Sequence, residues 1–125
     1  MKPRAAKPFG MPKAVRLRRR SEFLSVQEKG QKFPSECLLA MVLPSATAGG
    51  ATRVGLTVSS KVGNAVVRNR VRRRLRELFR RQPDSFPRGL DVVLIARSTA
   101  AEADLPRLKR AFDRVASDMR RRLSS

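Results

Sequence analysis

Residues 53–80 read RVGLTVSSKVGNAVVRNRVRRRLRELFR, and this is the most informative stretch of the 125-residue chain. It opens with an alternation that places Val54, Leu56 and Val58 on one side, which is typical of a β-strand with one buried face. The opposite side would carry Gly55, Thr57 and Ser59. Residues 53–59 therefore predict a strand whose second face is low and polar.

The remainder of this stretch predicts a long amphipathic helix. Asn64 can cap its first turn, and the helix would run to about Arg81, shortly before Pro83. At about 100° per residue, one arc of roughly 120° is apolar and an opposite arc of roughly 100° is polar and mostly cationic. The apolar arc contains Val67, Val71, Leu75, Leu78 and Phe79, and the cationic arc contains Asn69, Arg72, Arg73, Arg76 and Arg80.

This helix belongs to a strongly basic chain, in which 29 Lys and Arg oppose 10 Asp and Glu for a formal net charge of +19. Between Arg68 and Arg81 there are eight Arg and one acid, Glu77. Neighbouring cations on an isolated helix repel one another, so the run indicates an anionic partner. Arg outnumbers Lys by 22 to 7. Because guanidinium groups bind phosphate and stack on bases, this excess favours structured RNA. A solvated helix face and an Arg-rich genome composition are the alternatives.

The residue types that are scarce exclude several classes of protein. There is no His and a single Cys, Cys37, so the sequence offers no Ser-His-Asp, Cys-His or metal-ligand set. The protein alone is therefore not expected to be an enzyme. No apolar run approaches the roughly 18 residues of a membrane span, and the cysteine usage favours a reducing, cytoplasmic setting. We interpret Cys37 as a small buried or half-buried apolar residue.

The first half of the chain predicts a tail, a helix and strands. Residues 1–14 are interpreted as a flexible basic tail, with an organellar transit peptide as the alternative, and residues 15–125 as one domain. A short helix would follow, capped by Ser21, continuing to about Lys29 and ended by Gly30. Strands are expected at Lys32 and Phe33 and at residues 36–43 and 53–59, the last two joined by a hairpin loop, PSATAGGAT.

The end of the chain predicts one more strand and one more helix. DVVLIAR at residues 91–97 is a strand that is apolar along its length, and Asp104 can cap the last helix. That helix would bury one face, made by Leu105, Leu108, Phe112, Val115, Met119 and Leu123. The predicted order is helix, two or three strands, helix, strand, helix.

Four short motifs together resemble the protein subunit of bacterial ribonuclease P. They are RLRRRSEF at residues 16–23, RVGL-x-V-S at 53–59, K-x-G-N-A-V-x-R-N-R at 61–70 and DVVLIAR at 91–97. The resemblance extends over residues 16–123. It implies an α+β fold with a four-stranded mixed sheet packed on helices and a left-handed crossover around the basic helix, contrary to the common rule.

The same resemblance implies a function in which the chemistry belongs to RNA. Ribonuclease P is an endonuclease that removes the 5′ leader from precursor tRNA, and its RNA subunit holds the catalytic site. The protein would bind the catalytic RNA and the precursor tRNA as a monomer, one per RNA, with neither membrane nor DNA as a partner. Mg²⁺ would be held by the RNA. The residues implied to bind the catalytic RNA are Lys61, Arg68, Asn69, Arg70, Arg72, Arg73 and Arg76.

The resemblance also implies a cleft between the first helix and the sheet that holds the single-stranded leader. Its residues would be Arg19, Phe23, Gln27, Leu39 and Met41. Gln27 and Met41 stand where aromatic residues are common in the family, and a stacked base is worth about 1–3 kcal/mol. The leader contact would then depend more on Arg. Ordinary core packing is the alternative for Phe23 and Met41.

Two other classes of protein fit the composition. A small basic α+β domain with a flexible tail also describes a structural ribosomal protein or another RNA assembly protein. A membrane-active or general DNA-binding protein fits the charge, but no spacing identifies a DNA recognition helix. The motifs favour the ribonuclease P subunit.

Overall fold

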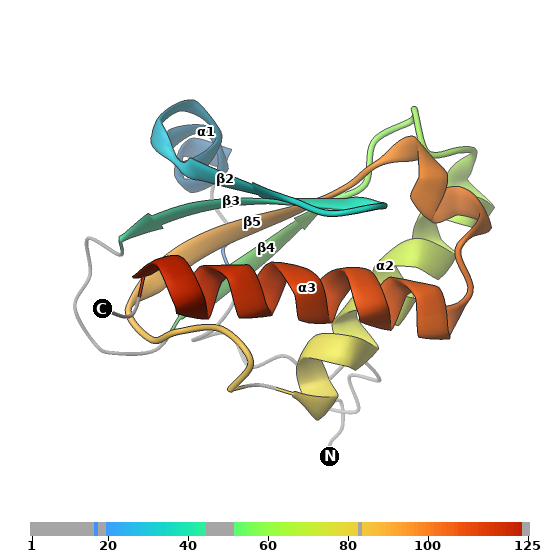
Figure 1. The fold of residues 1–125 in the computed structure, drawn as a ribbon. Coiled ribbons are helices and arrows are strands. Elements are labelled where there is room, and N and C mark those ends of the chain that lie inside the picture. The colour runs from blue at the N-terminus through green and yellow to red at the C-terminus, as the bar shows by residue number, and fades with distance from the viewer. Residues whose placement is uncertain (1–16, 18–19, 45–51, 83, 124–125) are drawn as a thin grey trace, which may run out of the picture.

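A four-stranded sheet forms the centre of the computed structural model, which describes residue 17 and residues 20–44, 52–82 and 84–123 (Figure 1). Its strands are β2 (Gln31–Pro34), β3 (Leu38–Pro44), β4 (Arg53–Thr57) and β5 (Leu90–Ala96), in the order β2-β3-β5-β4. β3 pairs antiparallel with both β2 and β5, whereas β4 lies parallel to β5. The sheet is therefore mixed, as the resemblance implies. The predicted tail at residues 1–14 lies outside the described residues.

The predicted hairpin between residues 36–43 and 53–59 is wrong, because β5 lies between β3 and β4. The sequence of β5 explains its place in the sheet. Val92, Val93 and Leu94 follow one another, and all three are buried. A strand that is apolar on both faces needs cover on both, and the middle of this sheet provides it because helices lie over both of its faces.

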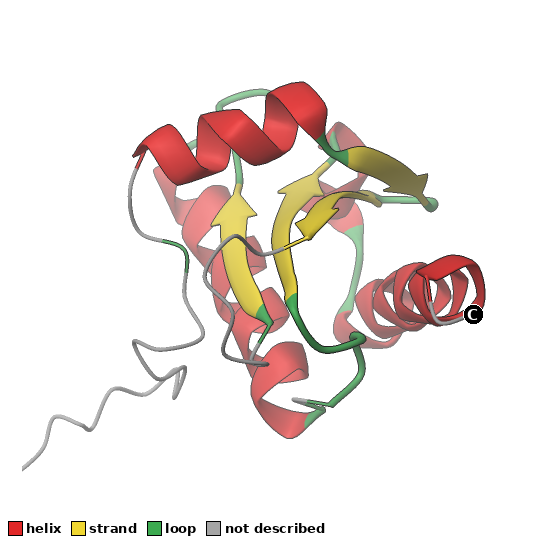
Figure 2. Ribbon diagram, turned by 90° about the vertical axis from the view of Figure 1, so that its left-hand side faces the viewer, coloured by secondary structure: helices red, strands yellow, loops and turns green. Residues whose placement is uncertain are grey.

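Three α-helices cover the two faces of the sheet (Figures 1 and 2). α1 (Arg20–Lys29) lies on one face, and α2 (Ala65–Arg81) and α3 (Leu105–Leu123) lie on the other. The order of helices and strands agrees with the prediction, with an additional 3₁₀ helix, η2 (Ser98–Glu102), before α3. None of the described helices combines the length and the hydropathy that a membrane span requires.

The start of α1 differs from the prediction by two residues, because a cap at Ser21 would make Glu22 the first helical residue. The helix begins at Arg20, so Ser21 lies inside the first turn instead of capping it. The chain meets the sheet just before the helix, because the Leu17 N–H donates to the Val54 carbonyl at 3.1 Å. Gly30 follows α1 as expected, and its N–H donates to the Val26 carbonyl at 2.7 Å.

The predicted apolar faces of α2 and α3 form the larger core against the sheet. Val71, Leu75, Leu78 and Phe79 of α2 and Leu108, Phe112, Val115 and Met119 of α3 are buried there, and Val67, Leu105 and Leu123 pack at its edge. Cys37 belongs to the same cluster and is fully buried, as interpreted. Because one face of each strand supplies this core, the other face is left for α1.

A smaller core lies between α1 and the second face of the sheet. It contains Leu17, Val26, Met41 and Val93, with Phe23, Leu39, Leu43 and Ile95 packed against it. Alternation along the strands sorts the side chains between the two cores, since Val92 and Leu94 belong to the larger and Val93 to the smaller. Apolar side chains therefore occupy part of the space between α1 and the sheet.

Candidate nucleic-acid interface

The basic face of α2 begins at a well-formed helix cap. Asn64 has an extended backbone, and its Oδ1 accepts a hydrogen bond from the Val67 N–H at 3.0 Å, which confirms the predicted cap. This bond satisfies one of the free amides of the first turn. It fixes where the helix starts, and with it the direction in which each following Arg points.

One flank of α2 faces the loop that follows β4. The Arg68 Nε–H donates to the Gly63 carbonyl at 3.2 Å, and the Arg72 Nη2–H donates to the Val58 carbonyl at 3.5 Å. Within the helix, the Arg72 Nη1–H also donates to Asn69 Oδ1 at 3.0 Å. Lys61 is exposed in the same loop. A guanidinium has five N–H donors, so these bonds hold the side chains in place and leave other donors for an anion. Four of the predicted RNA-binding residues are thus brought together here.

The opposite flank of α2 faces η2. The Arg70 Nη2–H donates to the Ala101 carbonyl at 3.5 Å, and the Arg74 Nη1–H donates to the Ala103 carbonyl at 2.8 Å. Arg70 was among the predicted residues and Arg74 was not. The sequence could have indicated Arg74, because it follows Arg70 by four residues and residues four apart lie on one side of a helix. Between the two flanks lie Arg73, which is exposed, and Arg76, which is half-buried.

The last turn of α2 differs from the rest because its positive charge is partly neutralised. Glu77 forms ion pairs with Arg80 at 2.7 Å and with Arg81 at 2.6 Å. Hydrogen bonds from Arg80 and then Arg81 lower the pKa of Glu77 from 4.5 to about 2, so the carboxylate is charged at neutral pH. The strongest cationic region therefore lies N-terminal to Glu77, from Arg68 to Arg76.

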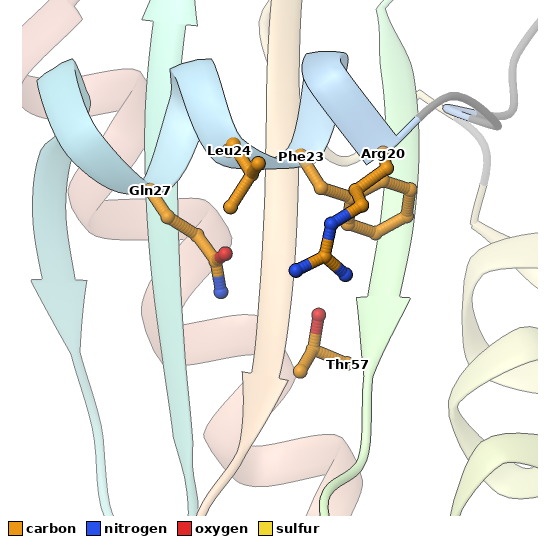
Figure 3. Close-up of a pocket in the computed structure, with 5 residues that line it drawn as sticks. All are labelled: Arg20, Phe23, Leu24, Gln27 and Thr57. Atoms are coloured by element: carbon orange, nitrogen blue, oxygen red, sulfur yellow. The ribbon is translucent and has the colours of Figure 1, made fainter.

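A second feature, a pocket of about 390 Å³, lies between α1 and β4 (Figure 3). Four of its lining residues, Arg20, Phe23, Leu24 and Gln27, come from α1, and Thr57 comes from β4. Figure 3 shows the Arg20 guanidinium and the Gln27 amide extending from the helix toward the side on which Thr57 lies. The pocket combines an apolar wall, one cation and two neutral polar groups.

Gly55 makes room for this arrangement. A Cβ at Gly55 would lie 2.4 Å from Cζ of Phe23, well inside van der Waals contact. The Phe23 ring therefore rests directly on the backbone of β4, and the predicted low face at Gly55 is covered by this ring. The absence of a side chain at one strand position decides how closely α1 approaches the sheet.

The structure places the predicted leader-binding residues in different environments. Phe23 and Gln27 line the pocket. Leu39 is half-buried against the smaller core, and Met41 is a member of it, 4% exposed. Arg19 lies outside the described residues.

Sequence reasoning did not identify three residues of the pocket. Arg20 and Leu24 precede Phe23 and Gln27 by three residues each, so they lie near them on the helix surface. Thr57 belongs to the polar strand face that the alternation had predicted. Leu24 is also unusual in being 49% exposed for a large apolar side chain. Helical spacing alone could have suggested the residues of α1, but the approach of β4 to them is a tertiary feature.

A basic helix packed on a four-stranded mixed sheet, with a small pocket on the opposite face, defines a small RNA-binding α+β protein. A family model described as Ribonuclease P matches residues 11–120. The chain therefore belongs to the family of bacterial ribonuclease P protein components.

Individual relatives support the same family. The chain is 42% identical over 109 residues to the ribonuclease P protein component of Desulfovibrio desulfuricans, covering 87% of this chain and 80% of the relative. It is 44% identical over 112 residues to that of Gluconacetobacter diazotrophicus, covering 89% and 90%. The structure is similar to that of the Staphylococcus aureus RNase P protein, with a TM-score of 0.76 and 25% identity over 85% of this chain and 95% of that one.

Family membership establishes the general activity. The chain is a protein subunit of ribonuclease P and assists the processing of the 5′ leader of precursor tRNA. The RNA subunit of ribonuclease P and precursor tRNA are the partners that this membership implies.

Proposed function

We propose that the basic face of α2 and the pocket at α1 each bind a different RNA. The basic face of α2 binds the catalytic RNA, and the pocket under α1 binds the single-stranded 5′ leader. The α2 surface consists of the predicted residues Lys61, Arg68, Asn69, Arg70, Arg72, Arg73 and Arg76, to which we add Arg74.

The observation that carries the α2 assignment is the separation of charge along this helix. Its acid, Glu77, is engaged by Arg80 and Arg81 in the last turn. The turns before it carry six Arg, at positions 68, 70, 72, 73, 74 and 76, and no carboxylate. Guanidinium groups held against backbone carbonyls are already oriented, so less side-chain entropy is lost when phosphate binds. Such a surface suits the closely spaced phosphates of a folded RNA.

The lining of the α1 pocket supports the leader assignment. Phe23 and Leu24 offer apolar surface to a base, Arg20 offers a cation to a phosphate, and Gln27 and Thr57 can exchange hydrogen bonds with a base edge. Its volume of about 390 Å³ is within the range of small-ligand sites. Met41 and Leu39 would act beneath this surface, by supporting α1 through the smaller core.

Mg²⁺ fits the RNA better than it fits this protein surface. Mg²⁺ prefers carboxylate and phosphate oxygens, and the proposed interface presents guanidinium groups that repel it. We therefore assign the ion to the RNA, where it would activate the attacking water and neutralise phosphates. The protein would contribute positive charge that lowers the repulsion between catalytic RNA and substrate. We propose one monomer per catalytic RNA, acting in the cytoplasm, without membrane or DNA partners.

Reconstitution with catalytic RNA tests both assignments. At low Mg²⁺, adding the protein should increase cleavage of a precursor tRNA with a long leader over that by RNA alone, and no gain would refute the function. Gln27→Ala should weaken binding of the long-leader substrate and leave a substrate with a single leader nucleotide unchanged. Equal weakening of both substrates would refute the pocket as the leader site. Arg68→Ala with Arg72→Ala should weaken binding of the catalytic RNA itself.

A further inference from the structure

We propose that Arg53 is a positioning residue for the leader pocket, which acts by holding α1 through Glu22. This inference rests on the proposed function, because it concerns the pocket assigned there to the leader. It adds a residue that lies outside the pocket and outside the basic face of α2. Its evidence is a three-way ion-pair arrangement that joins α1, β4 and β5.

Arg53 makes contacts in two directions at once. Its Nε–H and Nη2–H donate to the two carboxylate oxygens of Asp91 at 3.0 and 2.9 Å, in the paired geometry that guanidinium favours. Its Nη1–H donates to Glu22 Oε2 at 2.8 Å. Arg53 and Asp91 are direct partners across β4 and β5, so the first contact lies within the sheet. The second contact extends from the sheet to α1.

The surroundings strengthen both contacts. The side chains of Arg53, Glu22 and Asp91 are 21%, 25% and 10% exposed, so water screens them less than it screens a surface pair. The hydrogen bond to Asp91, followed by that to Glu22, raises the pKa of Arg53. Because two hydrogen bonds to Asp91 hold the guanidinium on the sheet face toward α1, its remaining Nη1–H points to a defined place, and Glu22 meets it there.

The position of Glu22 on α1 explains why this contact controls the pocket. At about 100° per residue, Val26 and Phe23 lie about 40° and 100° around the helix from Glu22, while Gln27 and Arg20 lie about 140° and 160° around it. Val26 is buried against the sheet, and the Phe23 ring packs on the sheet at Gly55. Glu22 therefore lies on one side of the Val26 and Phe23 contact with the sheet, and Arg20 and Gln27 lie on the other side.

This arrangement resists rolling of α1 on the sheet. Val26 and Phe23 supply an apolar contact that is not directional, so it permits small rotations. The Glu22–Arg53 bond holds one flank, and release of that flank would let the other flank move, carrying Arg20 and Gln27 relative to Thr57. Arg53, Gly55 and Thr57 alternate along β4 and share the face toward α1. Along this one strand, Arg53 binds Glu22, Gly55 contacts the Phe23 ring and Thr57 lines the pocket.

Glu22→Gln is the sharpest test, because it removes the charge that holds α1 and leaves the Arg53–Asp91 pair within the sheet. Glu28→Gln is the matched control, since Glu28 is an exposed acid of the same helix and its replacement changes the net charge equally. With reconstituted holoenzyme, we expect Glu22→Gln to raise KM for a long-leader precursor tRNA about threefold to tenfold, as for a partly exposed charged hydrogen bond. KM for a single-nucleotide leader, kcat and affinity for the catalytic RNA should be unchanged.

Amide hydrogen exchange gives a second readout in the holoenzyme. Exchange in α1 should be faster in Glu22→Gln than in Glu28→Gln, with α2 and α3 unaffected. Unchanged KM and exchange in Glu22→Gln, while Gln27→Ala still loses leader affinity, would overturn the positioning role and leave the pocket assignment intact. If Gln27→Ala also has no effect, the pocket assignment itself fails. Equal effects of Glu22→Gln and Glu28→Gln, or equal losses with both leaders, would also overturn the proposal.

Discussion

Replacing Arg68 and Arg72 with Ala should make binding to the catalytic RNA less sensitive to salt. Both side chains lie on the flank of α2 beside the loop that follows β4. Each cation that neutralises a phosphate releases counterions, so the logarithm of the binding constant falls with the logarithm of the salt concentration. The number of contacts can therefore be measured as a slope.

The structure sets the expected size of this slope. Glu77 engages Arg80 and Arg81 in the last turn, and we count the six Arg of the preceding turns, at positions 68, 70, 72, 73, 74 and 76, as the phosphate ligands. With about 0.7–0.9 per phosphate, six contacts predict a slope of about −4 to −5. Loss of two contacts should flatten it by about one to two units. A titration of labelled catalytic RNA over a range of KCl concentrations, at constant free Mg²⁺, measures both values.

A variant with the same change in net charge separates local contacts from a general effect of charge. Arg110→Ala with Arg114→Ala removes two exposed cations from α3, where Arg114 already pairs with Asp118. This control should leave the slope close to that of the parent protein. An unchanged slope in the α2 variant, or equal flattening in both variants, would refute α2 as the docking surface. Circular dichroism would show that both variants are folded.

Three further predictions concern the pocket, the helix cap and pH. Gly55→Ala should lower the free energy of unfolding in urea by about 1–3 kcal/mol, because the new Cβ displaces the Phe23 ring. The same variant should bind the long-leader substrate more weakly. Parent-like values for both quantities would contradict the packing of the Phe23 ring on Gly55. Asn64→Ala should cost about 1 kcal/mol of unfolding free energy by leaving the Val67 N–H without its cap, whereas Asn64→Ser should retain most of it; equal losses would argue against capping. The pKa of Glu77 is lowered on folding, so its pairing stabilises the protein above about pH 4.5 and is lost as pH falls toward 2. The difference in Tm between the parent and Glu77→Gln should accordingly shrink over that interval, and a constant difference would contradict the pairing.

Local patterns in the sequence were sufficient for the helices. α2 was predicted with both ends, because a capping side chain and a regular apolar spacing act within a few residues of one another. Asp104 caps α3 in the same way, with its Oδ1 accepting from the Arg107 N–H at 3.0 Å. The start of α1 was misplaced by two residues, and the chain just before this helix is bound to β4 through the Leu17 N–H. Helix boundaries that depend on the sheet are therefore less predictable.

The order of the strands could not be read from neighbouring residues. Proximity in the chain suggested a hairpin between β3 and β4, whereas β5, which follows both in sequence, pairs with each of them. The apolar run in β5 indicated burial on both faces but did not specify its partners. Pairing between distant segments depends on how the whole domain buries its surface, and one strand's pattern fits several neighbours.

The two parts of the candidate site differ in the same way. The sequence by itself determined the basic face of α2, because a 3.6-residue period sorts Arg from apolar residues on one continuous element. The pocket could be found only in the tertiary structure, because its lining combines Arg20 and Gln27 of α1 with Thr57 of β4, which are far apart in the sequence. The tertiary structure also decided that Arg53 reaches both Asp91 and Glu22. A helix face is set by local geometry, whereas a pocket and an ion-pair network require segments that only the packed sheet brings together.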